Sequence, residues 1–151
     1  MALDIRPAQE SDARQILVLA ALMTQESPRF SKHEFSLDKA LAFFNTLLEH
    51  GGLFVATKGE QIIGFFAGFV VEHFLSNQSF ASDAGVYVLP EHRGGSAFVR
   101  LVKAFEDWAR ERGASEIHLG TSTGVQPEKT VRMYERLGYT MNSYGLLKTE
   151  V

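Results

Sequence analysis

The segment from Val86 to Ala97 carries residues of the types and in the order that suit a phosphate site. Its sequence, VYVLPEHRGGSA, reads as a strand that ends in a glycine-containing turn and then opens a long amphipathic helix. Such a turn aims unpaired backbone N–H groups and the positive end of a helix dipole at one point. Arg93 adds a forked cation, and the small residues after it let a ligand approach the main chain. We predict a site for a phosphorylated cofactor; the competing interpretation is an ordinary strand–turn–helix connection.

Two common phosphate-binding patterns are absent from the sequence. No Gly is followed by four residues and then Gly-Lys-Ser/Thr, as a P-loop requires, and no G-x-G-x-x-G string occurs. The predicted site therefore depends on a short loop at a helix N-terminus.

The composition limits the classes of protein to which the chain can belong. Its 151 residues, 45% of them hydrophobic, suit a single domain spanning residues 1–151. The net charge of −3 argues against a nucleic-acid partner held by a general basic field. Without cysteine, and with five histidines that show no ligand spacing, we expect no metal site. No hydrophobic leader or transmembrane run is visible, so we expect a cytoplasmic protein without a membrane partner.

Hydrophobic periodicity predicts the elements that position the loop. Helical spacing of apolar residues predicts helices over residues 12–23, 37–48, 96–112 and 127–137. Apolar runs bounded by turn residues predict strands over residues 3–6, 53–57, 62–72, 81–89, 116–120 and 146–151. The order β-α-α-β-β-β-α-β-α-β favours an α/β protein with a mixed sheet and helices on both faces.

This order and the glycine loop resemble the GCN5-related N-acetyltransferase (GNAT) family over essentially the whole chain. Family members carry a Q/R-x-x-G-x-G/A signature after the fourth strand, which holds the pyrophosphate of acetyl-CoA. The six positions here read Glu91-His92-Arg93-Gly94-Gly95-Ser96, so the first is Glu and the last is Ser. The resemblance implies a mostly antiparallel sheet, the GNAT-like acyl-CoA N-acyltransferase fold and acetyl-CoA as co-substrate. The cofactor-binding residues that it implies are Tyr87, Val88, Arg93, Gly94, Gly95, Ser96 and Ala97.

The segment from Tyr134 to Tyr139, YERLGY, is similar to the family's Tyr-x-x-x-Gly-Phe/Tyr segment. In many members this Tyr protonates the departing coenzyme A thiolate, so the resemblance implies Tyr134 as the general acid. The competing interpretation is a helix tyrosine whose ring packs into the core. Where the family usually has Asn at the start of this helix, the chain has Pro127.

The implied reaction is direct transfer of an acetyl group from acetyl-CoA to an amine, and the amine must first lose a proton. We predict Asp83 as the base. Simple alternation along its strand turns Asp83 to the wrong face, and a β-bulge near Gly85 would restore it. Glu72 is the alternative base, and a solvated surface carboxylate is the competing interpretation for both. The backbone N–H of Val88 is expected to stabilise the oxyanion.

The predicted function is therefore an N-acetyltransferase acting on a primary amine of a small molecule or a protein. The alternatives are a non-catalytic acyl-CoA-binding or regulatory domain and a transferase of longer acyl groups. The net charge of −3 is compatible with cationic amines but selects none. A homodimer is compatible with the family resemblance and with the aromatic content.

Overall fold

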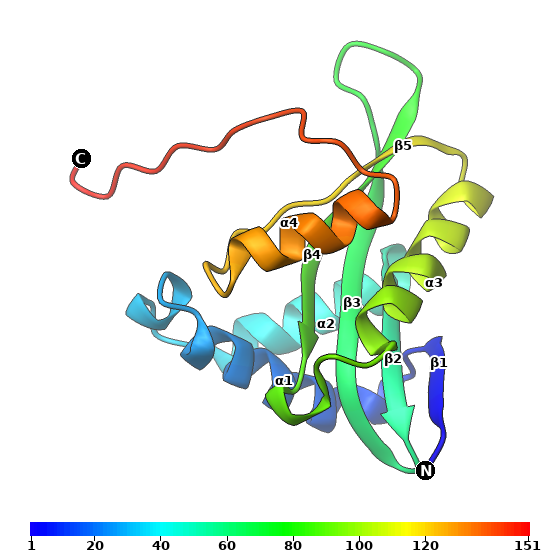
Figure 1. Ribbon diagram of the computed structural model, residues 1–151, viewed down its shortest axis with the longest axis vertical. Helices are drawn as coiled ribbons and strands as arrows, with labels where there is room; N and C mark the ends of the chain where they lie inside the picture. Colours follow the sequence, from blue (N-terminus) through cyan, green and yellow to red (C-terminus); the bar gives the residue numbers. More distant parts are fainter.

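The computed structural model describes residues 1–151, and its centre is a five-stranded mixed sheet (Figure 1). The strands follow chain order across the sheet, and neighbouring pairs are antiparallel except the last, which is parallel. The mixed, mostly antiparallel sheet predicted from the sequence is confirmed. The strands are β1 (Leu3–Pro7), β2 (Gly52–Lys58), β3 (Gln61–Glu72), β4 (Ser79–Val88) and β5 (Ala114–His118).

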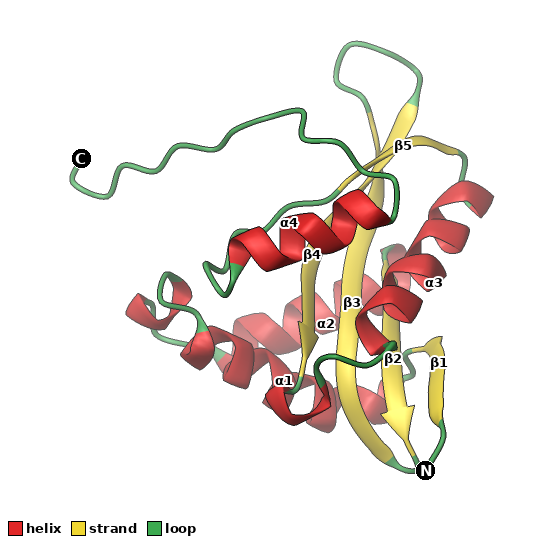
Figure 2. Cartoon of the chain, viewed as in Figure 1, coloured by secondary structure: helices red, strands yellow, loops and turns green.

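Four α-helices cover the two faces of the sheet (Figure 2). The pair α1 (Ala13–Glu26) and α2 (Leu37–His50) packs on one face, and α3 (Ala97–Glu111) and α4 (Pro127–Arg136) pack on the other. Short 3-10 turns occupy Glu10–Asp12, Phe30–Lys32 and Pro90–His92. The helices predicted from periodicity are therefore all present.

The core lies mainly between α3 and the two central strands. The apolar side of α3 is fully buried, and the ring of Phe105 packs on Phe66 of β3 with 4.5 Å between centroids. A Cβ added to Gly68 would lie 2.5 Å from the Phe105 ring, so glycine is needed there for the helix to approach the sheet. The buried residues of this helix are Ala97, Leu101, Val102, Phe105 and Ala109.

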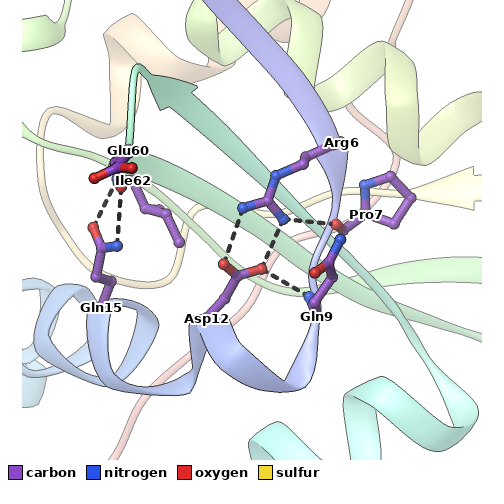
Figure 3. A network of polar contacts seen from close by, with 7 residues as sticks. All are labelled: Arg6, Pro7, Gln9, Asp12, Gln15, Glu60 and Ile62. Atoms are coloured by element: carbon purple, nitrogen blue, oxygen red, sulfur yellow. Dashed lines mark hydrogen bonds and ion pairs between the residues drawn. The ribbon is translucent and has the colours of Figure 1, made fainter.

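A polar network joins β1 and the start of α1 (Figure 3). Arg6 donates two hydrogen bonds to the carboxylate of Asp12, at 2.7 and 2.9 Å, and the backbone N–H of Gln9 donates a third at 2.8 Å. Gln15 accepts from the N–H of Ile62 at 2.8 Å and donates to the carbonyl of Glu60 at 3.1 Å. These bonds hold the first helix against the β2–β3 hairpin.

The C-terminal strand predicted over Leu146–Val151 is wrong. Residues 140–151 form no helix or strand, and every one of them is exposed. A strand needs a neighbour for its backbone N–H and C=O groups, and this segment has none in the chain. The preceding strand also lies two residues earlier than predicted, at Ala114–His118. None of the helices combines the length and the apolar character needed to cross a bilayer.

Candidate active site

A bulge interrupts β4 next to the predicted base. Gly85 pairs with Ala67 of β3, and Asp83 pairs with Gly68. Ala84 is therefore left without a partner on β3. Between the two pairs β4 advances by two residues while β3 advances by one, which defines a β-bulge. The bulge expected near Gly85 is present.

The bulge decides which face of the sheet Asp83 occupies. Gly85 lies opposite Met23 of α1, whereas Gly68 lies against Phe105 of α3. Because residues paired across an antiparallel ladder project to the same face, Asp83 lies on the α3 face with its partner Gly68. Without the bulge, strict alternation from Gly85 would place Asp83 on the α1 face. The unpaired Ala84 is the extra residue that moves Asp83 to the α3 face.

The edge of β4 opens at the same point. Pairing between β4 and β5 ends at Ser82 with His118, so β4 has no neighbour on this side from Asp83 onward. The N–H of Leu89 donates to Ile63 of β3 at 2.8 Å. Since successive residues of a strand direct their peptide groups to opposite edges, the N–H of Val88 faces the opened edge. An N–H group that faces an open strand edge can donate to a group bound there.

Asp83 has an acid–base character suited to catalysis near neutral pH. Burial of the carboxyl raises its pKa to about 6, although the backbone N–H groups of Gly120 and of Asp83 itself act in the opposite direction. Glu72, the alternative base, is exposed and lies four residues beyond Gly68, roughly 13 Å along β3. The geometry therefore favours Asp83.

Tyr134 projects from α4 into the same region with an unusual hydroxyl. The residue is only 5% exposed, and its hydroxyl has no hydrogen-bond partner. Burial raises the pKa of this phenol, and the negative charge of Asp83 raises it further, so the hydroxyl keeps its proton. The ring packs against Phe98 and Tyr139, with centroids 5.5 and 5.7 Å away. Core packing explains the ring but not a buried donor without an acceptor.

The glycine loop before α3 presents an open backbone surface. Gly94 has φ +90°, a conformation that favours glycine, and a Cβ added to Gly94 or Gly95 would meet no atom within 4 Å. Ser96 is the N-cap residue of α3, but its side chain makes no capping hydrogen bond. The first N–H groups of α3, which begins at Ala97, are therefore left without a side-chain acceptor, as a phosphate group requires.

The side chain of Arg93 is engaged by Glu26 and by the end of β4. Its guanidinium binds Glu26 at the end of α1 through two hydrogen bonds, of 2.6 and 2.9 Å. Its Nε also donates to the carbonyl of Val88 at 2.8 Å. The forked cation thus ties α1 to the end of β4, because carboxylate geometry matches the guanidinium fork. The polar groups of this loop that stay open are therefore those of its backbone.

The side chain of Tyr87 is also turned toward α1. Its hydroxyl donates to Glu26 at 3.0 Å, and the Arg93 guanidinium lies 5.3 Å from its ring centroid, so the side chain faces α1 and not the opened edge. Burial and the hydrogen bond to Glu26 raise the pKa of Tyr87 to about 12. Sequence reasoning missed Glu26, since it lies 67 residues before Arg93 and belongs to no motif.

The comparisons with known proteins concern the family and the fold. A family model described as "Acetyltransferase (GNAT) family" matches residues 18–139. No curated protein matches the chain in sequence.

Several solved structures share the fold over nearly the whole chain. A transcriptional regulator from Bacillus halodurans C-125 is 25% identical, with a TM-score of 0.80 over 98% of this chain and 99% of that one. AAC(6')-Iy, in complex with the bisubstrate analog CoA-S-monomethyl-acetylneamine, is 18% identical, with a TM-score of 0.80 over 100% and 99%. A ribosomal-protein-alanine N-acetyltransferase from Brucella melitensis biovar Abortus 2308 is 19% identical, with a TM-score of 0.76 over 99% of each chain.

Proposed function

Because the chain belongs to the Acetyltransferase (GNAT) family, we propose that it moves the acetyl group of acetyl-CoA to a primary amine by direct attack. The observation that carries the proposal is the bulge at Ala84. It places the carboxyl of Asp83 on the sheet face where α4 holds the unpartnered hydroxyl of Tyr134. A proton acceptor and a proton donor then lie beside the opened edge of β4.

Each residue has a defined part in this reaction. The backbone N–H groups of Gly95, Ser96 and Ala97 bind the pyrophosphate at the start of α3. The carboxylate of Asp83 takes a proton from the attacking amine, directly or through water. The N–H of Val88 stabilises negative charge on the thioester oxygen. The hydroxyl of Tyr134 protonates the leaving thiolate, which supplies the partner that this hydroxyl otherwise lacks.

The acceptor class is the finer part of the proposal. The similar structures include an aminoglycoside acetyltransferase and a ribosomal-protein-alanine N-acetyltransferase, so both small-molecule and protein amines belong in a screen. The half-buried carboxyl of Asp83 favours acceptors that arrive as cations and are neutralised at the site.

The first test is calorimetric titration with acetyl-CoA, coenzyme A and a longer acyl-CoA. Saturable binding of acetyl-CoA supports the site at the start of α3. Tighter binding of the longer acyl-CoA would favour the alternative, a transferase of longer acyl groups. A panel of amines with thiol detection then measures turnover. Binding without turnover on any amine would favour the alternative, a non-catalytic acyl-CoA-binding domain.

Two variants locate the base within this scheme. Asp83→Asn should abolish most turnover and leave acetyl-CoA binding intact. Glu72→Gln is the matched control, because Glu72 is an exposed carboxylate on the neighbouring strand. Loss of turnover in the control with full activity in Asp83→Asn would reverse the assignment.

A further inference from the structure

The end of α1 is bound to the loop that precedes α4. This loop, residues 119–126, is here called the α4 loop and joins β5 to the helix that carries Tyr134. Ser27, the C-cap residue of α1, is fully buried, and its hydroxyl donates to the carbonyl of Thr123 at 2.5 Å. The two residues are 96 positions apart in the sequence. Figure 1 shows the α4 loop reaching toward the segment that follows α1.

The hydroxyl of Ser27 forms every hydrogen bond that it can form. Besides donating to Thr123, it accepts from the backbone N–H of Phe30 at 2.9 Å and from that of Arg29 at 3.3 Å. A serine hydroxyl offers one donor and two acceptor positions, so all three are in use. One oxygen atom therefore both shapes the turn after α1 and binds the α4 loop.

Two flanking contacts extend the attachment along the α4 loop. Arg29 donates to the carbonyl of Ser122 at 3.2 Å. A Cβ added to Gly124 would lie 3.2 Å from the side chain of Pro28, so this glycine lets the proline pack on the loop. Three consecutive residues after α1 thus contact three consecutive residues of the α4 loop.

The α4 loop meets the proposed base at one end and leads to the proposed acid at the other. The backbone N–H of Gly120 stabilises the carboxylate of Asp83 and so acts to lower its pKa. At its far end the loop enters α4, which carries the buried hydroxyl of Tyr134. The pairing of β4 with β5 ends before Asp83, so no sheet hydrogen bond holds the loop at this level. The attachment to α1 supplies this support.

The neighbouring residue of α1 binds the other side of the opened edge. Glu26 accepts two hydrogen bonds from Arg93, at 2.6 and 2.9 Å, and one from the hydroxyl of Tyr87 at 3.0 Å. Both partners belong to the end of β4 and the glycine loop after it. Two adjacent residues of α1 therefore bind the two sides of the opening, Glu26 the side of β4 and Ser27 the side of α4.

We propose that Ser27 is a positioning residue for acetyl transfer, which through Thr123 holds the α4 loop in place between Asp83 and Tyr134. Ser27 acts through the loop and not on a reacting atom, since all the hydrogen bonds of its hydroxyl are to backbone groups. The inference rests on the proposed function for the roles of Asp83 and Tyr134. The attachment itself can be tested without substrate.

A carboxyl-carbon NMR titration of Asp83 in the free protein is this first test. Ser27→Ala releases the loop and with it the N–H of Gly120, so the pKa of Asp83 should rise from about 6 by roughly half a pH unit or more. The neighbours on β3 and α3, Gly68 and Phe105, carry no charge. The phenol of Tyr134 on α4 keeps its proton in this range, so it does not cause the change.

Two further variants complete the titration. Thr24→Val is the matched control, because the hydroxyl of Thr24 donates within α1, to the carbonyl of Ala20 at 3.0 Å, and its loss should leave the pKa of Asp83 unchanged. Ser27→Cys fills the space that alanine leaves empty and offers a weaker donor, so it keeps the packing and should give a smaller rise. A pKa of Asp83 that does not rise in Ser27→Ala and Ser27→Cys overturns the proposal.

Turnover measurements then separate this proposal from the proposed function. Ser27→Ala should lower kcat roughly tenfold or more, because the acid and the base lose their mutual placement. The acid limb of kcat/KM should move to higher pH together with the titration of Asp83, and Thr24→Val should match the native enzyme. Native kcat and a native limb in Ser27→Ala overturn the positioning role although the activity exists. A native chain that acetylates no amine removes the proposed function, and with it the catalytic role of Ser27, even where the titration shows the attachment.

Discussion

Replacement of Tyr134 by Phe should make the protein more stable and less active at the same time. The tyrosine hydroxyl is buried and has no hydrogen-bond partner, while the ring packs on Phe98 and Tyr139. Phenylalanine keeps the ring contacts and removes the buried polar group. An unsatisfied buried group costs about 1–3 kcal/mol, so the free energy of unfolding should rise by roughly that amount.

The expected size of both effects follows from general magnitudes. For a chain of this length, about 1 kcal/mol corresponds to roughly 2–4 °C in the thermal midpoint, so the midpoint should rise by several degrees. Loss of a general acid should lower kcat by roughly 100-fold or more. The affinity for acetyl-CoA should stay nearly constant, because phenylalanine keeps the ring contact with Phe98 at the start of α3, where we propose that the pyrophosphate binds. Thermal unfolding, thiol-release kinetics and calorimetry measure the three quantities.

Tyr139→Phe is the matched control for this experiment. Its hydroxyl also belongs to a packed ring but donates to Glu106 at 2.7 Å, so the same chemical change should destabilise the protein by about 1 kcal/mol. Its turnover should be unchanged. The reasoning is refuted if Tyr134→Phe lowers the unfolding midpoint while retaining the native rate.

Three further predictions concern Asp83, the glycine loop and the Arg6–Asp12 ion pair. The pH profile of kcat/KM should rise with pH through about 6 as Asp83 loses its proton, and Asp83→Asn should remove this limb; an identical profile rejects Asp83 as the base. Gly94→Glu should weaken acetyl-CoA binding by roughly 100-fold through charge repulsion at the loop. The control is Gly113→Glu, since Gly113 has a similar positive φ of +83°, and this variant should bind acetyl-CoA as the native protein does. An equal loss of affinity in both variants would mean that backbone strain, and not charge at the loop, weakens binding. Asp12→Asn should destabilise the protein by about 1.5–3 kcal/mol at neutral pH. Because Arg6 lowers the pKa of Asp12, this difference should shrink as the pH falls below 3.8, and a difference that persists in acid would contradict the ion-pair explanation.

The sequence by itself determined the features that depend on neighbours along the chain. The apolar stripe of α3 follows from a 3.6-residue period, and the glycine loop at Gly94 and Gly95 follows from contiguous residues. The tyrosine segment at Tyr134 is equally local. Periodicity, turn chemistry and motifs act over a few residues, so these features could be predicted without knowledge of the fold.

The tertiary structure decided the features that depend on register and on distant partners. Asp83 reaches the face covered by α3 because the register with β3 pairs it with Gly68, which lies against Phe105, and leaves Ala84 unpaired. No residue near Asp83 in the sequence encodes that contact.

The same reason explains the absence of the predicted C-terminal strand and the unforeseen partner of Arg93. Arg93 binds Glu26 because folding brings the end of α1 beside the end of β4, although 67 residues separate them. The segment Leu146–Val151 has the pattern of a strand, but a strand exists only where another strand accepts its hydrogen bonds. Local pattern therefore specifies what a segment can become, and the assembled sheet decides whether a partner is within reach.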